Sequence, residues 1–119
     1  VKFYEKYQES IDKTRSETLI KIHELKLKNK KIIAVGAAAK GNTYLNYYGL
    51  NNTLIDFVTD SSAYKIGKYT PLTRIPILSD EEVFSLYSEE VYVLILSWNI
   101  SEIIKSKLKS IYKNINYIN

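Results

Sequence analysis

Two apolar runs constrain the fold of this chain more than any other feature. The runs "IIAV" (32–35) and "VYVLILSW" (91–98) are rich in β-branched and aromatic residues and carry no charge. Strands that are buried on both faces have continuous apolar runs, whereas half-exposed strands alternate between apolar and polar residues. We therefore expect a parallel sheet with helices packed on both of its faces.

The segments around these runs favour the same arrangement. Helical spacing predicts one long helix over the first 30 residues, with its apolar positions at Tyr4, Tyr7, Ile11, Leu19, Ile22 and Leu25 or His23. Further along, we expect a helix over 41–48 ending at Gly49, a strand over 53–60, a long loop over 60–78 with a short edge strand near 75–77, a helix over 80–87, a helix over 100–112 and a strand over 115–118.

Ser79 and Asn99 are expected as the N-caps of the last two helices, because acidic residues follow each of them within one turn. The alternation of strands and helices predicts an α/β fold. We expect one small Rossmann-like domain of three layers over residues 1–119, with a mostly parallel sheet and a long N-terminal helix.

Composition excludes several kinds of protein. The 119 residues contain no cysteine and one histidine, His23, so disulfides and cysteine or histidine metal sites are not expected. No apolar stretch is long enough to cross a membrane, which favours a cytoplasmic protein. The net charge of +4 comes mostly from lysines on helix faces, and we expect no nucleic acid as partner. The chain begins at Val1 and has no methionine, which indicates a piece of a longer protein.

The segment "GAAAKGNT" (36–43) is similar to two phosphate-binding loops but completes neither. In the dinucleotide-binding pattern G-x-G-x-x-G, Ala38 occupies the place of the middle glycine, although Asp60 lies near the usual position of the ribose-binding acid. In the pattern G-x-x-x-x-G-K-[ST], Asn42 occupies the place of the lysine. A tight turn that binds nothing is the simpler interpretation. Against it, the small residues leave a helix N-terminus open to an anion.

Polar and aromatic residues follow three of the expected strands, and the carboxyl ends of parallel strands meet at one edge of a sheet. We therefore predict a binding site at this edge. No nucleophile, base and acid can be assembled there, so we expect no catalytic residue. The candidate binding residues are Gly36, Ala37, Ala38, Lys40, Gly41, Asn42, Thr43, Asp60, Lys65, Lys68, Tyr69, Trp98 and Asn99.

The string "GAAAKGNTYLNYYG … IDFVTDSSAYKIGKYTPLTRIPI … VYVLILSWN" resembles the C-terminal domain of bacterial sugar C-methyltransferases. The resemblance runs from the first helix to the last strand. It implies a Rossmann-like domain that helps to bind a nucleotide-diphosphate sugar at an interface with the methyltransferase domain of the same chain. S-adenosylmethionine and zinc would be held by other parts of such an enzyme, and no cofactor by this domain. The blocks that carry the resemblance are 36–43, the residues Lys65, Gly67, Lys68, Tyr69 and Pro71, and the pair Trp98 and Asn99.

Three functions stay open at this point. The first is a domain that binds and positions a nucleotide sugar without transferring a methyl group by itself. The second is a packing module without a ligand, whose tyrosine-bearing first helix docks on the methyltransferase domain. The third is an independent dinucleotide-binding domain, against which Ala38 argues.

Overall fold

The computed structural model describes residues 2–36, 39–60, 66–70, 72–96 and 101–118, and for residues 2–12 and 39–43 it describes the backbone alone. The elements in chain order are α1 (Lys2–Leu27), β1 (Lys31–Val35), α2 (Ala39–Tyr48), β2 (Phe57–Thr59), β3 (Ile77–Leu78), α3 (Asp80–Ser85), β4 (Val91–Ile95), α4 (Ser101–Ile111) and β5 (Ile115–Tyr117).

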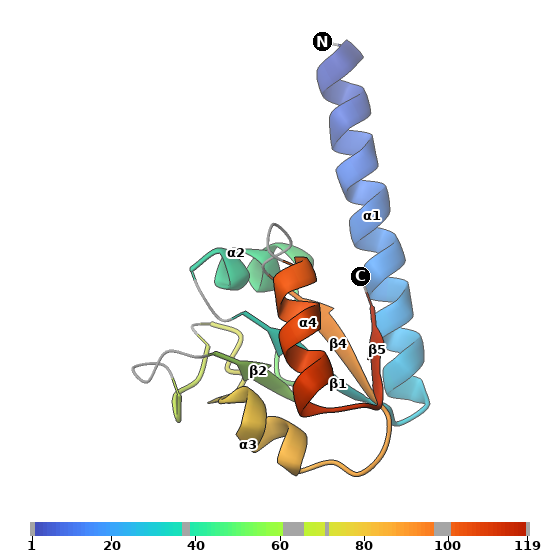
Figure 1. Cartoon of the computed structure of the whole chain (residues 1–119). Coiled ribbons are helices and arrows are strands. Elements are labelled where there is room, and N and C mark those ends of the chain that lie inside the picture. The colour runs from blue at the N-terminus through green and yellow to red at the C-terminus, as the bar shows by residue number, and fades with distance from the viewer. Residues whose placement is uncertain (1, 37–38, 61–65, 71, 97–100, 119) are drawn as a thin grey trace.

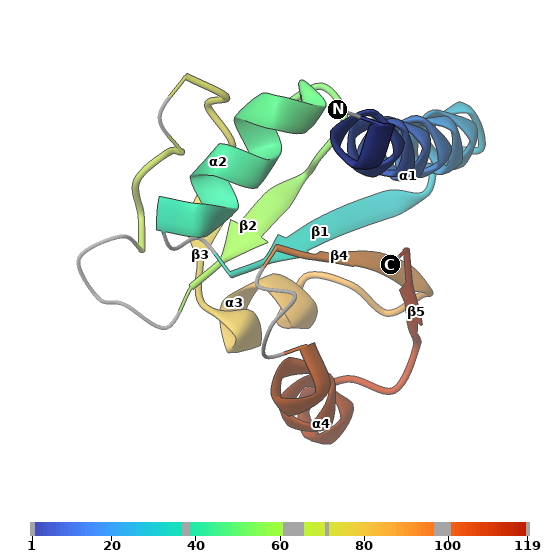
Figure 2. The same cartoon turned by 90° about the horizontal axis from the view of Figure 1, so that it is seen from above.

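The strands form one sheet in the order β3-β2-β1-β4-β5, and every neighbouring pair is parallel. Figure 2 shows α1 and α2 on one face of this sheet and α3 and α4 on the other. The predicted three-layer α/β fold with a parallel sheet is therefore confirmed, and so is the long N-terminal helix.

Each face of the sheet carries its own core, because successive residues of a strand point to opposite faces. In β1, Ile32 and Ala34 pack with α1 and α2, whereas Ile33 and Val35 pack with α3 and α4. All four side chains are buried, which explains why this strand has no polar alternation.

Two helices, α1 and α2, are each followed by a residue in the left-handed backbone conformation. The N–H groups of Gly49 and Leu50 donate to the carbonyls of Asn46 and Leu45, and Gly49 has a φ of 69°, as predicted for the residue that ends α2. The same pattern ends α1 at Asn29, which has a φ of 58°. The first helix therefore stops three residues earlier than the predicted 30.

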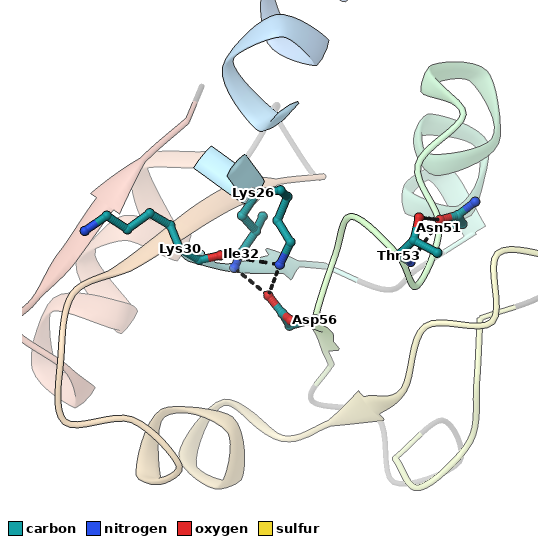
Figure 3. A network of polar contacts seen from close by, with 6 residues as sticks. All are labelled: Lys26, Lys30, Ile32, Asn51, Thr53 and Asp56. Atoms are coloured by element: carbon teal, nitrogen blue, oxygen red, sulfur yellow. Dashed lines mark hydrogen bonds and ion pairs between the residues drawn. The ribbon is translucent and has the colours of Figure 1, made fainter. Parts of the chain in front are cut away.

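The second strand is shorter than predicted. Asn51 holds residues 51–55 in a turn: its carbonyl accepts from the N–H groups of Leu54 and Ile55, and its Oδ1 accepts from Thr53 N–H at 2.9 Å (Figure 3). Local side-chain hydrogen bonds of this kind compete with strand pairing. The predicted strand over 53–60 was therefore wrong in its first half, and β2 begins at Phe57.

The helix after Ser79 has the predicted N-cap but is shorter. Glu82 N–H donates to Ser79 Oγ at 3.2 Å, and the Ser79 hydroxyl donates to Glu82 Oε1 at 3.0 Å. The helix ends at Ser85 rather than at Tyr87. The helix predicted over 100–112 is α4, but its predicted cap, Asn99, lies outside the described residues.

The first helix reaches well beyond the sheet. A helix of 26 residues is about 39 Å long, whereas a strand of five residues measures about 17 Å. Because a short turn joins α1 to β1, the two run in opposite directions, and the N-terminal turns of α1 project past the carboxyl ends of β4 and β5 (Figure 1). None of the described helices combines the length and apolarity that a membrane crossing requires.

Candidate functional site

The carboxyl ends of four strands lie at one level of the sheet. Val35, the last residue of β1, pairs with Thr59 of β2 on one side and with Ile95 of β4 on the other. Thr59 pairs in turn with Leu78, the last residue of β3. The segments that follow these strands must therefore start side by side.

The first residue beyond each strand extends this pairing. Gly36 N–H donates to the Thr59 carbonyl at 3.1 Å, and Asp60 N–H donates to the Leu78 carbonyl at 3.1 Å. Gly36 and Asp60, both predicted as site residues, are thus fixed on adjacent strands at the same edge. Neither lies in the deep core, because both are half-buried.

The chain changes direction between β1 and β4, which are neighbours in the sheet. From β1 it continues into α2 on one face, and from β4 it continues into α4 on the other face (Figure 2). In open α/β sheets, such a switch point leaves a crevice where ligands bind. Gly36 lies at this point with a φ of 103°, in a region that residues with a side chain rarely adopt.

The N-terminus of α2 lies at the same edge. The helix begins at Ala39 and not at Gly41 as predicted, so Lys40, Gly41 and Asn42 all belong to its first turn. Backbone N–H groups in a first turn have no partner within the helix and carry a partial positive charge. Ala37 and Ala38, which join β1 to this helix, lie outside the described residues.

The described part of the connection between β2 and β3, residues 66–70 and 72–76, forms a hydrogen-bonded turn, and the edge strand predicted near 75–77 is β3 at Ile77–Leu78. Gly67 N–H donates to the Ile77 carbonyl at 2.8 Å, and Ile77 N–H donates to the Lys68 carbonyl at 2.8 Å. Inside the turn, the buried hydroxyls of Thr70 and Thr73 are hydrogen-bonded to each other.

This turn presents two of the predicted residues to solvent. Lys68 is exposed, and the Tyr69 ring is 66% exposed although the backbone on both sides is anchored. Arg74 in the same turn is also exposed and has a φ of 55°. The turn is therefore a fixed support for one aromatic ring and two positive charges.

One buried hydroxyl near this edge, that of Thr59, has no hydrogen-bond partner among the described residues. Thr59 is 1% exposed, and its Oγ1 makes no hydrogen bond in the described structure. Buried polar atoms nearly always have a hydrogen-bond partner, so an exception calls for a physical explanation. Thr59 directly precedes Asp60, and its backbone carbonyl accepts the hydrogen bond from Gly36. Its side chain lies on the same face of the sheet as its pairing partner Val35, which is the face covered by α3 and α4 and not the face of α2.

Acid–base and metal chemistry have no visible support here. No three His, Cys, Asp or Glu residues of the described chain are grouped so as to hold a metal ion. Burial, reinforced by the charge of Asp56, raises the pKa of Tyr87 to about 12, but Tyr87 lies in the connection between α3 and β4, at the opposite edge of the sheet. The raised pKa of Tyr87 therefore concerns the amino edge and not the candidate site.

Comparison with known proteins decides the family. The sequence profile of the C-methyltransferase C-terminal domain matches residues 1–118. The chain belongs to this family. It is also 28% identical over 111 residues to the C-methyltransferase NovU of Streptomyces niveus, in an alignment that covers 93% of this chain and 26% of that protein. The chain thus spans about a quarter of the length of this relative.

The structure describes only part of the predicted site of this C-methyltransferase C-terminal domain. It brings together Gly36, Asp60 and the first turn of α2, and it exposes Lys68 and Tyr69 on the neighbouring turn. Lys40, Gly41, Asn42 and Thr43 are placed by their backbone alone. Ala37, Ala38, Lys65, Trp98 and Asn99 lie outside the described residues, so their roles stay predictions.

Sequence reasoning missed Thr59 and the ordered turn. Thr59 reads as an ordinary β-branched strand residue, and only the register shows that it ends beside Gly36. The turn had a signal in "TPLTR" (70–74), where two threonines flank a proline and a leucine. Their mutual hydrogen bond requires a fold-back that this spacing alone does not specify.

Proposed function

We propose that this C-methyltransferase C-terminal domain binds the diphosphate of a nucleotide-linked sugar and positions the sugar for methyl transfer. The observation that carries the proposal is the position of Gly36 and the first turn of α2 at the switch point of the sheet. The family supports a role within a methyltransferase, and the ligand is the part that we propose.

A diphosphate suits this edge for electrostatic reasons. Unpaired N–H groups in the first turn of α2 attract an anion, and the absence of a side chain at Gly36 lets the phosphate oxygens approach the backbone. Lys68 and Arg74 add exposed positive charge from the neighbouring turn.

Tyr69 and Asp60 suit the base, ribose and sugar of such a ligand. The exposed ring of Tyr69 offers a flat apolar surface on which a base or a sugar ring can stack. Asp60 is half-buried at the end of β2, within the group of residues that would surround a ribose or sugar hydroxyl. These contacts would fix the orientation of the ligand rather than activate it.

The catalytic contribution of this domain would be proximity. Holding the sugar in one orientation converts an encounter between two reactants into a reaction within one complex. S-adenosylmethionine supplies the methyl group in the proposed enzyme, and we propose that it and zinc are bound by other parts of the chain. The described residues of this domain contain no ligand set for zinc, so no step is assigned to that metal here.

The long first helix favours a partner domain at the carboxyl edge of the sheet. Its N-terminal turns project past the carboxyl ends of the strands, which makes them available to a methyltransferase domain facing the candidate site (Figure 1). A sugar bound at the switch point would then lie between the two domains.

Amide chemical shifts of the 119-residue chain, measured during a titration with thymidine diphosphate, test the ligand. We expect shifts in residues 36–43 and 60–69 and weaker binding by Lys68→Gln. Lys28→Gln is the matched control, because it removes an exposed lysine from the opposite edge of the sheet. The proposal fails if millimolar thymidine diphosphate shifts no amide in these segments, or if both variants weaken binding equally.

A second candidate function is a packing module without a ligand, and the projecting helix is the observation that favours it. On that hypothesis, changes at Tyr4 and Tyr7 reduce the activity of the complete enzyme, whereas Lys65→Ala with Lys68→Ala leaves it unchanged. Ligand positioning predicts a raised KM in the lysine pair instead. Measuring both variants in the complete enzyme separates the two functions.

A further inference from the structure

A groove on the far side of the molecule has a different chemistry from the candidate site. It has a volume of about 220 Å³ and lies between α4 and the outer strand β5. Lysines line it together with aromatic and apolar side chains. The residues used below are Lys105, Lys109, Lys113, Tyr112, Ile115 and Tyr117.

The lysines of this groove have no acidic partner in the described structure. Lys107, on another side of α4, forms an ion pair with Asp80 at 3.2 Å, so it is committed to the packing of α4 on α3. By contrast, Lys105, Lys109 and Lys113 form no ion pair with any described residue. Lys105 Nζ lies 4.9 Å from the centre of the Tyr117 ring, a cation–π contact that holds the ammonium group over the groove.

The net charge of the groove is positive. Glu102 is the acid nearest to it on α4, and its charge adds to burial in raising the pKa of Tyr117. Lys21 of α1 donates to the Ile118 carbonyl at 3.3 Å, which adds a positive charge on the other face of the same strand. An anionic partner is therefore attracted from both faces of the sheet edge.

The backbone of β5 is open along this groove. The Asn114 carbonyl and the Ile118 N–H are hydrogen-bonded to β4. Because backbone groups in a strand alternate in direction, those of Ile115 and Tyr117 point away from β4, toward the free edge of the sheet. These two residues also line the groove, so a strand added to the edge would lie over it.

The spacing of the lysines matches an extended peptide. Lys105 and Lys109 are four residues apart in a helix, which separates them by about 6 Å along its axis. Alternate side chains of a strand are about 6.7 Å apart and point to one face. Carboxylates at alternate positions of an added strand would therefore meet successive lysines.

We propose that the β5 edge and its groove form a docking site for an extended acidic peptide of a partner protein. The peptide pairs with the backbone of Ile115 and Tyr117 and directs its acidic side chains to Lys105, Lys109 and Lys113. This inference does not depend on the proposed nucleotide-sugar site, which lies at the carboxyl edge.

Fluorescence anisotropy with a labelled Glu-Val-Glu-Val-Glu-Val peptide tests the charge match. We expect salt-sensitive binding, and a loss of about tenfold or more in Lys105→Gln with Lys109→Gln. Lys28→Gln with Lys31→Gln removes the same charge from exposed positions elsewhere and is expected to bind like the parent chain. Equal weakening by both pairs would reduce the effect to net charge and overturn the proposal.

Two further probes test strand addition itself. Peptides N-methylated on one or the other alternate set of amides should differ, because only one set faces β5; equal affinity of the two overturns backbone pairing. A single-stranded oligonucleotide of the same charge should bind more weakly than the acidic peptide. Equal or tighter binding of the oligonucleotide would mean a general polyanion surface and would also overturn the proposal.

Discussion

The amino and carboxyl edges of the sheet differ in how their charged side chains are used: at the amino edge they are hydrogen-bonded, and at the carboxyl edge Lys68 is exposed. At the amino edge, Asp56 joins three segments: its Oδ2 accepts from Ile32 N–H at 2.9 Å and from Lys26 Nζ at 3.0 Å (Figure 3). Lys26 also donates to the Lys30 carbonyl, and Asp56 N–H donates to the Ile32 carbonyl. The end of α1 and the starts of β1 and β2 are thereby held together.

At the carboxyl edge, polar groups are left available instead. Lys68 is exposed, and the first N–H groups of α2 have no hydrogen-bond partner within their helix. The comparison teaches that side-chain hydrogen bonds between segments are made at the amino edge, whereas the carboxyl edge has unpaired or exposed polar groups, which we propose serve a ligand. Stability and binding should then respond to different substitutions.

Asp56→Ala gives the largest expected effect. It removes the acceptor for Lys26 and leaves the Ile32 N–H unpaired at the start of a buried strand, which should lower the free energy of unfolding by about 2–3 kcal/mol. The Lys26–Asp56 ion pair is about a quarter exposed and contributes the smaller part. Urea denaturation followed by circular dichroism measures the change.

Lys28→Ala is the control for this substitution. Lys28 is exposed in the turn that follows α1, so its replacement should lower the free energy of unfolding by no more than about 0.5 kcal/mol. If both variants unfold at the same urea concentration, the contacts of Asp56 do not stabilise the amino edge. The division of roles between the edges would then be wrong.

Comparing Gly36→Ala with Gly49→Ala separates the effect of backbone strain on stability from the effect on ligand binding. Both glycines have a positive φ, 103° and 69°, so alanine should lower the free energy of unfolding by about 1–2 kcal/mol at either position. Only Gly36 lies at the switch point, and only its substitution should weaken the thymidine diphosphate response. If the two folded variants respond equally to thymidine diphosphate, the ligand does not bind at Gly36.

Most of the fold could be predicted from the sequence because its signals are local. Continuous apolar runs indicated the buried strands β1 and β4, and Ser79 and Gly49 marked helix ends through hydrogen bonds within a few residues. The start of β2 could not be predicted in the same way. Leu54 and Ile55 look like strand residues, and the hydrogen bonds of Asn51 are what keep them in a turn.

The candidate site was less predictable because it depends on register. That Gly36 and Asp60 share an edge follows from parallel strands, and the sequence indicated both. Tyr47 and Tyr48 lie in the last turn of α2, where Tyr48 packs against the core and Arg15 of α1 lies over the ring of Tyr47. Contacts between α1 and α2 join residues far apart in the chain, and no local pattern encodes them.

Tyr87→Phe gives the smallest effect and tests the electrostatics of the amino edge. Burial, with the Asp56 carboxylate as second cause, raises the pKa of Tyr87 from 10.0 to about 12 in the folded chain. Between pH 10 and about 12, the unfolded chain releases this proton while the folded chain keeps it, so the tyrosine favours unfolding as the pH rises. Urea midpoints of the parent chain should therefore fall more steeply above pH 10 than those of Tyr87→Phe, while other tyrosines and lysines affect both chains alike. Parallel pH profiles would contradict the raised pKa. In Asp56→Ala the steep fall should be reduced but still present, because burial is the larger of the two causes.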